Sequence, residues 1–165
     1  MGVTSYPTDI DFVSTDINLV GGKNAEVGMV REDHKGRRFM LVVAGGTINI
    51  GTGIILAANA FAESSNATLP IWGANTMGVV LTVGQYFWMQ TYGLALNALV
   101  SDGDVVDQDI LTCGTNCVTG HAAVTTSTGQ NYLGYAIGDD YGSDPYYVKA
   151  FINPGSVGDT HAPAE

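Results

Sequence analysis

Apolar residues alternate with polar or small ones along most of the chain after residue 24. Such an every-second-residue period is typical of strands that bury one face. The clearest runs span residues 27–30, 38–44, 47–50, 77–83, 85–92, 94–100, 118–126, 132–137 and 146–152. Short strands separated by glycine-rich turns predict an all-β fold, a small β-barrel or sandwich of short antiparallel strands with an extended N-terminal arm. We expect no long helix, because no stretch combines helical periodicity with capping residues.

Glycines divide these runs, and the chain has 22 of them. Gly36 stands at the expected turn between the first two strands, and Gly93 is expected to end the most aromatic strand. Residues 54–62 are apolar almost throughout and fit either a buried strand or a short helix. We expect residues 64–76 to form a loop, and the pair Asn153-Pro154 to stop the last strand.

The first 24 residues differ from the rest of the chain. Their polar residues alternate loosely with apolar ones, four of which are Ile10, Phe12, Ile17 and Leu19. We interpret residues 1–24 as an extended arm that gains order by packing against another surface, although a frayed terminus fits the same pattern. Residues 25–153 then form the β domain, and residues 154–165 a flexible acidic tail.

The charge content of the chain indicates which class of partner this domain contacts. Hydrophobic residues make up 45% of the chain and charged ones only 13%, about half the usual charged fraction. A surface with so few charges favours association with other proteins. The net charge of −10 argues against nucleic acid, whose phosphates need Lys and Arg as partners. No apolar run is long enough to span a membrane, and residues 1–16 lack the features of a signal peptide, so we expect a soluble protein made in a cytoplasm.

Five of the six basic residues lie between Lys23 and Arg38. Residues 31–38 form a run in which two acidic residues interrupt the basic ones and Gly36 occupies the turn. The run fits a solvated hairpin end. It also fits an electrostatic docking site for an acidic patch on a partner protein.

No group of residues indicates catalysis, and we expect neither a cofactor nor a metal. Cys113 and Cys117 lack the four-ligand spacing of a zinc site and fit a tight turn, with reduced thiols or a short disulfide. The three histidines are scattered. Four aspartates follow a turn but miss the EF-hand spacing, and local capping explains them better: Asp102, Asp104, Asp107 and Asp109.

The most aromatic strand candidate is apolar on both faces. Alternation places Tyr86, Trp88 and Tyr92 on one face and Phe87 and Met89 on the other. A row of aromatic side chains can stack on sugars. The commoner use of such a strand is core packing on one face and a subunit interface on the other.

Several segments, taken in order, resemble tailed-bacteriophage head decoration (cement) proteins. Residues 30–46 are similar to their early hairpin, with a basic glycine turn and a second strand that ends in Ala-Gly. Residues 84–93 resemble their central aromatic strand, and residues 102–106 and 133–136 fit the turn and late strand that follow. The residues of the 57–76 insertion, the paired cysteines and the acidic tail do not map onto that pattern.

This resemblance implies a β-rich protein, often trimeric, on the outer face of an icosahedral head, where it reinforces contacts between major capsid subunits. The expected partners are the major capsid protein and further copies of the chain in a homotrimer. The expected location is the outer capsid surface of the virion, after synthesis in the host cytoplasm. The residues expected to bind the capsid are Ile10, Phe12, Ile17, Leu19, Arg31, Lys35, Arg37 and Arg38. Those expected in the core or the oligomer interface are Tyr86, Phe87, Trp88, Met89 and Tyr92.

Two other functions compete with a structural role. A carbohydrate-binding module would use Trp72, Tyr86, Trp88 or Tyr141 as stacking platforms. A small β-barrel hydrolase would need an acidic pair such as Asp102 with Asp139, and we rank it last because carboxylates in turns are ordinary.

Overall fold

The computed structural model describes residues 13–63, 69–100, 105–113, 119–121, 131–142 and 146–156. Strands make up 54% of these residues and helix only 4%, which confirms the all-β prediction. The elements are α1 (Ile17–Gly21), β1 (Val30–Glu32), β2 (Arg38–Val43), β3 (Gly53–Ala57), β4 (Ala60–Glu63), β5 (Ile71–Ala74), β6 (Tyr86–Val100), β7 (Ile110–Cys113), β8 (Thr119–His121), β9 (Asn131–Ala136), β10 (Tyr141–Gly142) and β11 (Tyr146–Ser156).

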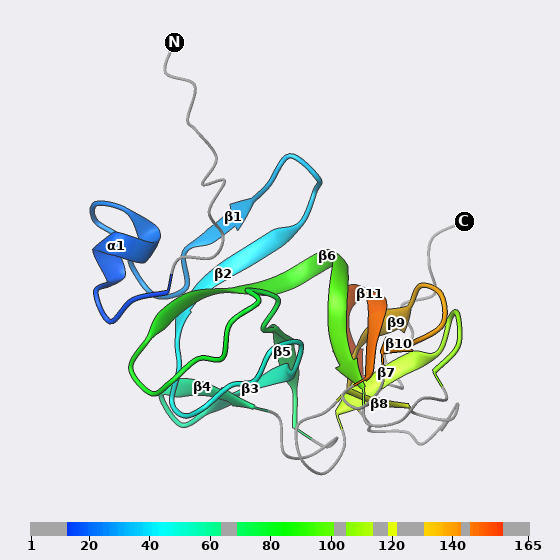
Figure 1. Cartoon of the computed structure of the whole chain (residues 1–165). Helices are drawn as coiled ribbons and strands as arrows, with labels where there is room; N and C mark the ends of the chain where they lie inside the picture. Colours follow the sequence, from blue (N-terminus) through cyan, green and yellow to red (C-terminus); the bar gives the residue numbers. More distant parts are fainter. Residues whose placement is uncertain are drawn as a thin grey trace.

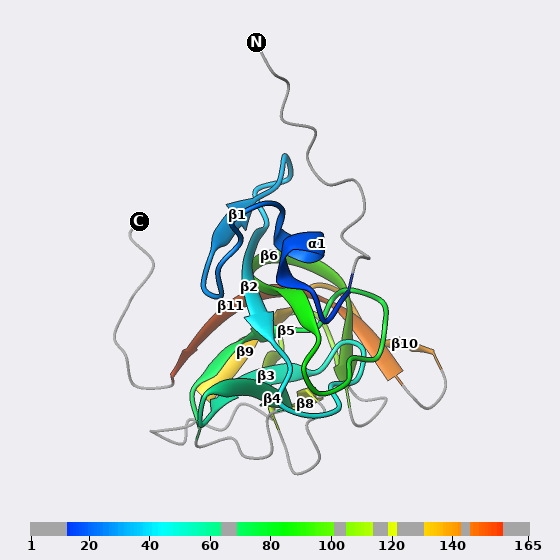
Figure 2. The same cartoon turned by 90° about the vertical axis from the view of Figure 1, so that its left-hand side faces the viewer.

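The named strands pair antiparallel throughout, in the order β4-β3-β5-β6-β11-β9-β7-β8. β1 joins through β2, which pairs with β6, and β10 joins through β11. Over the described residues the sheet is not closed into a barrel, so it corresponds to the sandwich-like alternative. In Figure 1 the helix and β1–β5 lie at one end of the molecule and β7–β11 at the other, with β6 running between them, and Figure 2 views the first end head-on.

The long strand β6 connects the two ends by changing partners. Its first part pairs with β2, from Tyr86↔Val43 to Tyr92↔Arg38, and the part after Gly93 pairs with β11. We expected Gly93 to end the strand, and that prediction is wrong. Gly93 has a φ of 95°, which only glycine adopts without strain, and its position bends β6 without interrupting it.

Each end of the sheet has its own hydrophobic core. The first gathers β2, β3 and the start of β6 around fully buried Leu41, Ile54 and Phe87. The second gathers the end of β6, β7, β9 and β11 around Ala98, Leu111 and Ile152. Small alanines on the inner face of β6 and β11 let β5 lie close against this second half of the sheet.

Two buried amide side chains hydrogen-bond to backbone groups where the strands are interrupted or bent. The Asn75 amide donates to the carbonyls of Asn49 (3.1 Å) and Val79 (2.9 Å) and accepts from the Met77 N–H. The Gln90 amide donates to the Gly93 carbonyl at 3.0 Å. These bonds hold the backbone of the loop after β5 and of β6 at its Gly93 bend.

The structure revises several strand predictions. Residues 77–83 form no strand, because Met77 and Leu81 point into the core from a loop and only an isolated bridge joins Leu81 to Ile48. The expected strand at 47–50 is reduced to the same bridge. The ambiguous residues 54–62 fold as the β3–β4 hairpin. The expected 64–76 loop contains β5.

The two ends of the chain also differ from expectation. Residues 17–21 are helical, not extended: Asp16 caps α1 by accepting from the Asn18 N–H at 2.9 Å. Ile10 and Phe12 lie outside the described residues. β11 continues past Asn153-Pro154 to Ser156, and the rest of the expected tail also lies outside them.

The cysteine turn lies partly outside the described residues. β7 and β8 pair antiparallel with Cys113 opposite Thr119, which fits a hairpin there. Cys117 is not among the described residues. No helix within the described ranges is long and apolar enough to cross a membrane.

Candidate functional site

The basic turn between β1 and β2 is organised by Asp33. Its carboxylate accepts from the backbone N–H groups of Lys35 (2.9 Å) and Arg37 (3.0 Å), and it pairs with the Arg37 guanidinium at 2.6 Å. Gly36, with a φ of 74°, completes the turn. The hairpin predicted from the sequence is confirmed, but the Arg37 charge already has a partner within it.

The pKa of the Asp33 carboxyl is lowered by these contacts. Partial burial alone would raise that pKa. The Arg37 side-chain hydrogen bond, the two backbone N–H groups and the Arg37 charge together outweigh the burial. The carboxylate is therefore ionised at neutral pH and holds the turn closed.

Arg31 joins the hairpin to α1. Its guanidinium donates to the Gly21 carbonyl at 2.6 Å and lies over the Trp88 ring, 4.7 Å from its centroid. The Trp88 indole N–H in turn donates to the Val20 carbonyl at 3.1 Å. The end of the predicted arm and the predicted basic turn are therefore adjacent parts of one surface, because both attach to Trp88.

The other predicted capsid-binding cations differ in availability. Arg38 pairs with Glu32 at 3.0 Å and lies over the ring of Tyr92 at 5.2 Å. Lys35 is exposed, and no carboxylate of the described residues lies within ion-pair distance of it. Lys35 is thus the cation of the turn that is available to a partner.

The α1–β1 stretch also exposes apolar side chains. Leu19 is 61% exposed, whereas Ile17 packs against the first core. Val27 and Val30 are also exposed, at 51% and 56%. We call the exposed side of residues 17–35 the N-terminal surface.

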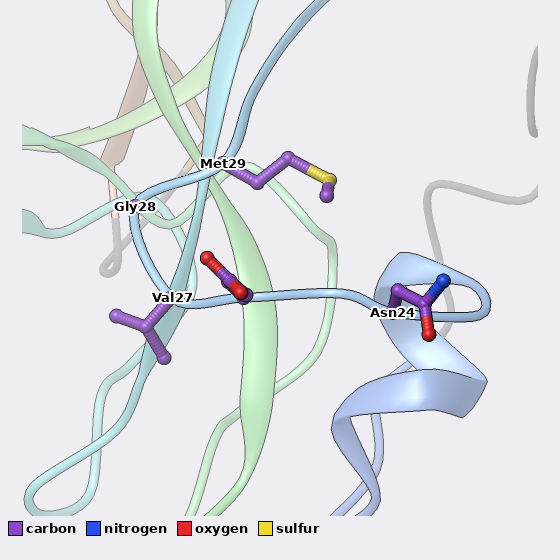
Figure 3. A pocket seen from close by; sticks show the side chains of 5 residues that line it. Asn24, Val27, Gly28 and Met29 are labelled. Atoms are coloured by element: carbon purple, nitrogen blue, oxygen red, sulfur yellow. The ribbon is translucent and has the colours of Figure 1, made fainter.

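A surface hollow of about 410 Å³ opens in this surface. Figure 3 shows it beside the segment that leads from α1 to β1, with Asn24 at the helix end and Val27 and Met29 pointing to different sides of the backbone. Its described lining is completed by Glu26 and Gly28. The hollow is wide enough to accept a side chain of a partner protein.

The aromatic strand is mostly core. Phe87, Trp88 and Met89 are buried in the first core, and α1 covers the Trp88 ring through the hydrogen bond to Val20. Tyr86 packs against the first core, and Tyr92 is 37% exposed. Since the Trp88 ring is covered, it cannot serve as a sugar-stacking platform.

The remaining candidate groups have local structural contacts. The Asp107 carboxylate accepts from the Gly138 N–H at 2.7 Å, and the Asp139 carboxylate from the Asp107 N–H at 3.4 Å. Asp102, proposed as the partner of Asp139 in a hydrolase, lies outside the described residues. Within the described parts of the chain, no group of three His, Cys, Asp or Glu side chains is placed to hold a metal ion.

A second surface escaped the sequence analysis. Leu94, Phe151, Tyr135 and Ile110 are register neighbours on β6, β11, β9 and β7 and form one row across the sheet. The row faces away from the second core, whose inner positions on the same strands are buried alanines and leucines. Together with Tyr92 and Leu96, these four residues make up what we call the outer apolar face. The signal in the sequence was the near absence of charge in these strands, where Lys149 is the one charged residue.

No protein-family model matches the sequence. No curated protein matches it either.

Proposed function

We propose that this protein is a structural decoration protein of an icosahedral phage head. It binds the outer surface of the shell, reinforces contacts between major capsid subunits, associates with further copies of itself as a homotrimer, and has no catalytic role. The proposal begins from the ordered sequence resemblance described above. It places the protein on the virion surface after synthesis in the host cytoplasm.

One observation supports the proposal most. The two elements expected to bind the shell, the end of the arm and the basic turn, lie on one continuous surface through the contacts of Arg31 with Gly21 and Trp88. That surface combines exposed Leu19, a hollow and the unpaired Lys35. Apolar contact area with a flanking cation suits an acidic or neutral protein surface.

Several copies held in one rigid assembly would strengthen this attachment. Each contact can be modest, because a trimer that touches the shell at several equivalent points dissociates only when all contacts break. A protein with this role needs a stiff fold and exposed apolar area. Both are features of this chain, whose strands form two separate buried cores.

The test is co-sedimentation with decoration-free heads of the phage that encodes the chain. Wild-type protein should pellet with the heads and saturate at a fixed number of copies. Leu19→Asp should weaken binding at least tenfold, because it places a carboxylate in the contact. Leu56→Asp is the matched control, since Leu56 is similarly exposed, at 45%, but lies on β3. The proposal fails if the wild-type protein stays in the supernatant, or if both variants bind as it does.

A further inference from the structure

We infer that the outer apolar face binds a second copy of this chain. The inference deepens the proposed function, since it names the surface through which the decoration protein associates with itself. It concerns a part of the sheet that is distant from the N-terminal surface: in Figure 1 β9 and β11 lie at the opposite end of the molecule from α1.

The face is an ordered array of side chains. The Phe151 ring stacks on Tyr135 with centroids 5.4 Å apart and meets the edge of Tyr92 at 5.1 Å. Leu94, directly opposite Phe151 in the register, continues the row on β6. Rings that are locked against each other in this way lose little conformational entropy when a partner covers them.

These side chains are apolar, whereas the solvated face of an antiparallel sheet usually carries polar residues. Leu96 is 58% exposed, Tyr135 42%, Leu94 41% and Tyr92 37%. With the partly exposed Phe151 and Ile110 they form one contiguous apolar patch that crosses β6, β11, β9 and β7. Contiguous exposed apolar patches of this kind mark protein–protein contacts.

The lack of charge in these strands indicates which partner binds the outer apolar face. Two copies that each carry a net charge of −10 repel one another wherever carboxylates meet. β6, β7, β9 and β11 contain no Asp or Glu, and their one charged residue is Lys149. The strands of this face therefore bring no carboxylate of their own into a contact between two acidic copies.

The same lack of charge disfavours the other occupants. A glycan needs several polar groups that converge beside the rings, whereas Leu94, Phe151 and Ile110 have none and the Tyr92 and Tyr135 rings carry one hydroxyl each. An acidic partner would find Lys149 and, at the Tyr92 edge of the face, Arg38, whose charge is already paired with Glu32. An uncharged apolar face is complementary to another of the same kind, and a second copy supplies it.

Sedimentation velocity of the full chain over a wide concentration range tests the inference. The wild-type protein should sediment as an oligomer of the 17.3 kDa chain. Leu94→Glu should shift it towards the monomer and weaken association at least tenfold, because a carboxylate then enters the contact from each copy. Val83→Glu, at a loop position that is 70% exposed, is the control and should retain the wild-type mass.

A second variant distinguishes loss of self-association from loss of folding. Leu96→Glu changes a more exposed side chain of the same face and should also yield monomers, with an unchanged circular dichroism spectrum. The inference is wrong if the wild-type protein is monomeric throughout, or if both leucine variants keep its oligomeric mass. Failure of self-association is separable from failure of shell binding. Leu19→Asp should no longer bind the phage heads, while its oligomeric mass in solution stays that of the wild type.

Discussion

Replacing Trp88 with Phe tests whether the N-terminal surface is held together as described. The Trp88 indole donates to the buried Val20 carbonyl and its ring lies under the Arg31 guanidinium. Phe keeps a ring but has no N–H, so the carbonyl loses its donor. Leaving a buried polar group unpaired costs about 1–3 kcal/mol. Weakening the cation–π contact adds about 0.5 kcal/mol.

The smaller ring also leaves space beside Leu41, which faces α1 next to Trp88. With this loss of packing we expect the free energy of unfolding to fall by about 2–4 kcal/mol in Trp88→Phe. The control is Trp72→Phe, because the chain has only two tryptophans. Trp72 is 42% exposed, and its ring meets the Phe61 ring edge-on at 6.1 Å. That variant should stay within about 0.5 kcal/mol of the wild type.

Urea unfolding followed by circular dichroism measures both values. All proteins are compared at one concentration, because self-association makes apparent stability depend on concentration. Trypsin cleavage after the exposed Lys23 gives a local readout, since release of α1 should accelerate it in Trp88→Phe and leave Trp72→Phe unchanged. Equal stabilities and equal cleavage rates in the two variants would refute the role assigned to Trp88.

Two further changes test other parts of the fold. Gly134→Ala should destabilise the protein by about 3 kcal/mol in thermal unfolding, because the added Cβ would overlap the Phe151 carbonyl of β11. The control is Gly46→Ala, whose Cβ meets no atom within 4 Å and which should change stability by less than about 0.5 kcal/mol. Similar losses of stability in the two variants would contradict the close approach of β9 and β11. Asp33→Asn should cost about 1 kcal/mol at neutral pH. The folded-state pKa of Asp33 lies below its ordinary 3.8. The stability advantage of the wild type over Asp33→Asn should therefore be complete above pH 3.8 and disappear as the pH falls through the lowered pKa. Urea midpoints of both proteins above and below this pH interval measure the advantage, and an advantage that stayed constant would refute the role of Asp33.

The strand pattern predicted the all-β class and the main hairpin because these depend on local alternation. The Gly36 turn follows from a glycine that adopts positive φ and an aspartate three residues before it that caps the turn. The late strands were equally visible, since their apolar runs lie between clear turn residues.

The course of β6 through Gly93 could not be predicted in the same way. A strand ends at a glycine when no neighbouring strand pairs with the residues after it, and the strand bends there when a neighbouring strand does. Here β2 supplies partners before Gly93 and β11 supplies them after it. Whether β6 continues past Gly93 therefore depends on the tertiary fold, because β11 lies more than fifty residues further along the chain.

The loop at residues 77–83 shows the opposite error. Its alternation looked like a strand because Met77 and Leu81 are buried, and burial alone produces that pattern. The hydrogen bonds that would define a strand go instead to the Asn75 amide. Local sequence does not show which partner takes a backbone group.

The candidate surfaces were predicted in part. The apolar and basic residues of the N-terminal surface were recognisable by type, but three of the four arginines and lysines chosen there have partners within the fold: Arg31, Arg37 and Arg38. The outer apolar face was missed because strand order was needed to see that Leu94, Phe151 and Tyr135 are neighbours. Alternation showed which residues share a strand face, but not which strands lie side by side.

Electron cryomicroscopy of decoration-free heads incubated with the purified protein tests the central claim most directly. The account predicts added density on the outer surface at symmetry-related positions, with α1 and the β1–β2 turn directed towards the shell and the outer apolar faces of neighbouring copies in contact. Heads that show no added density after incubation at saturating protein would contradict it.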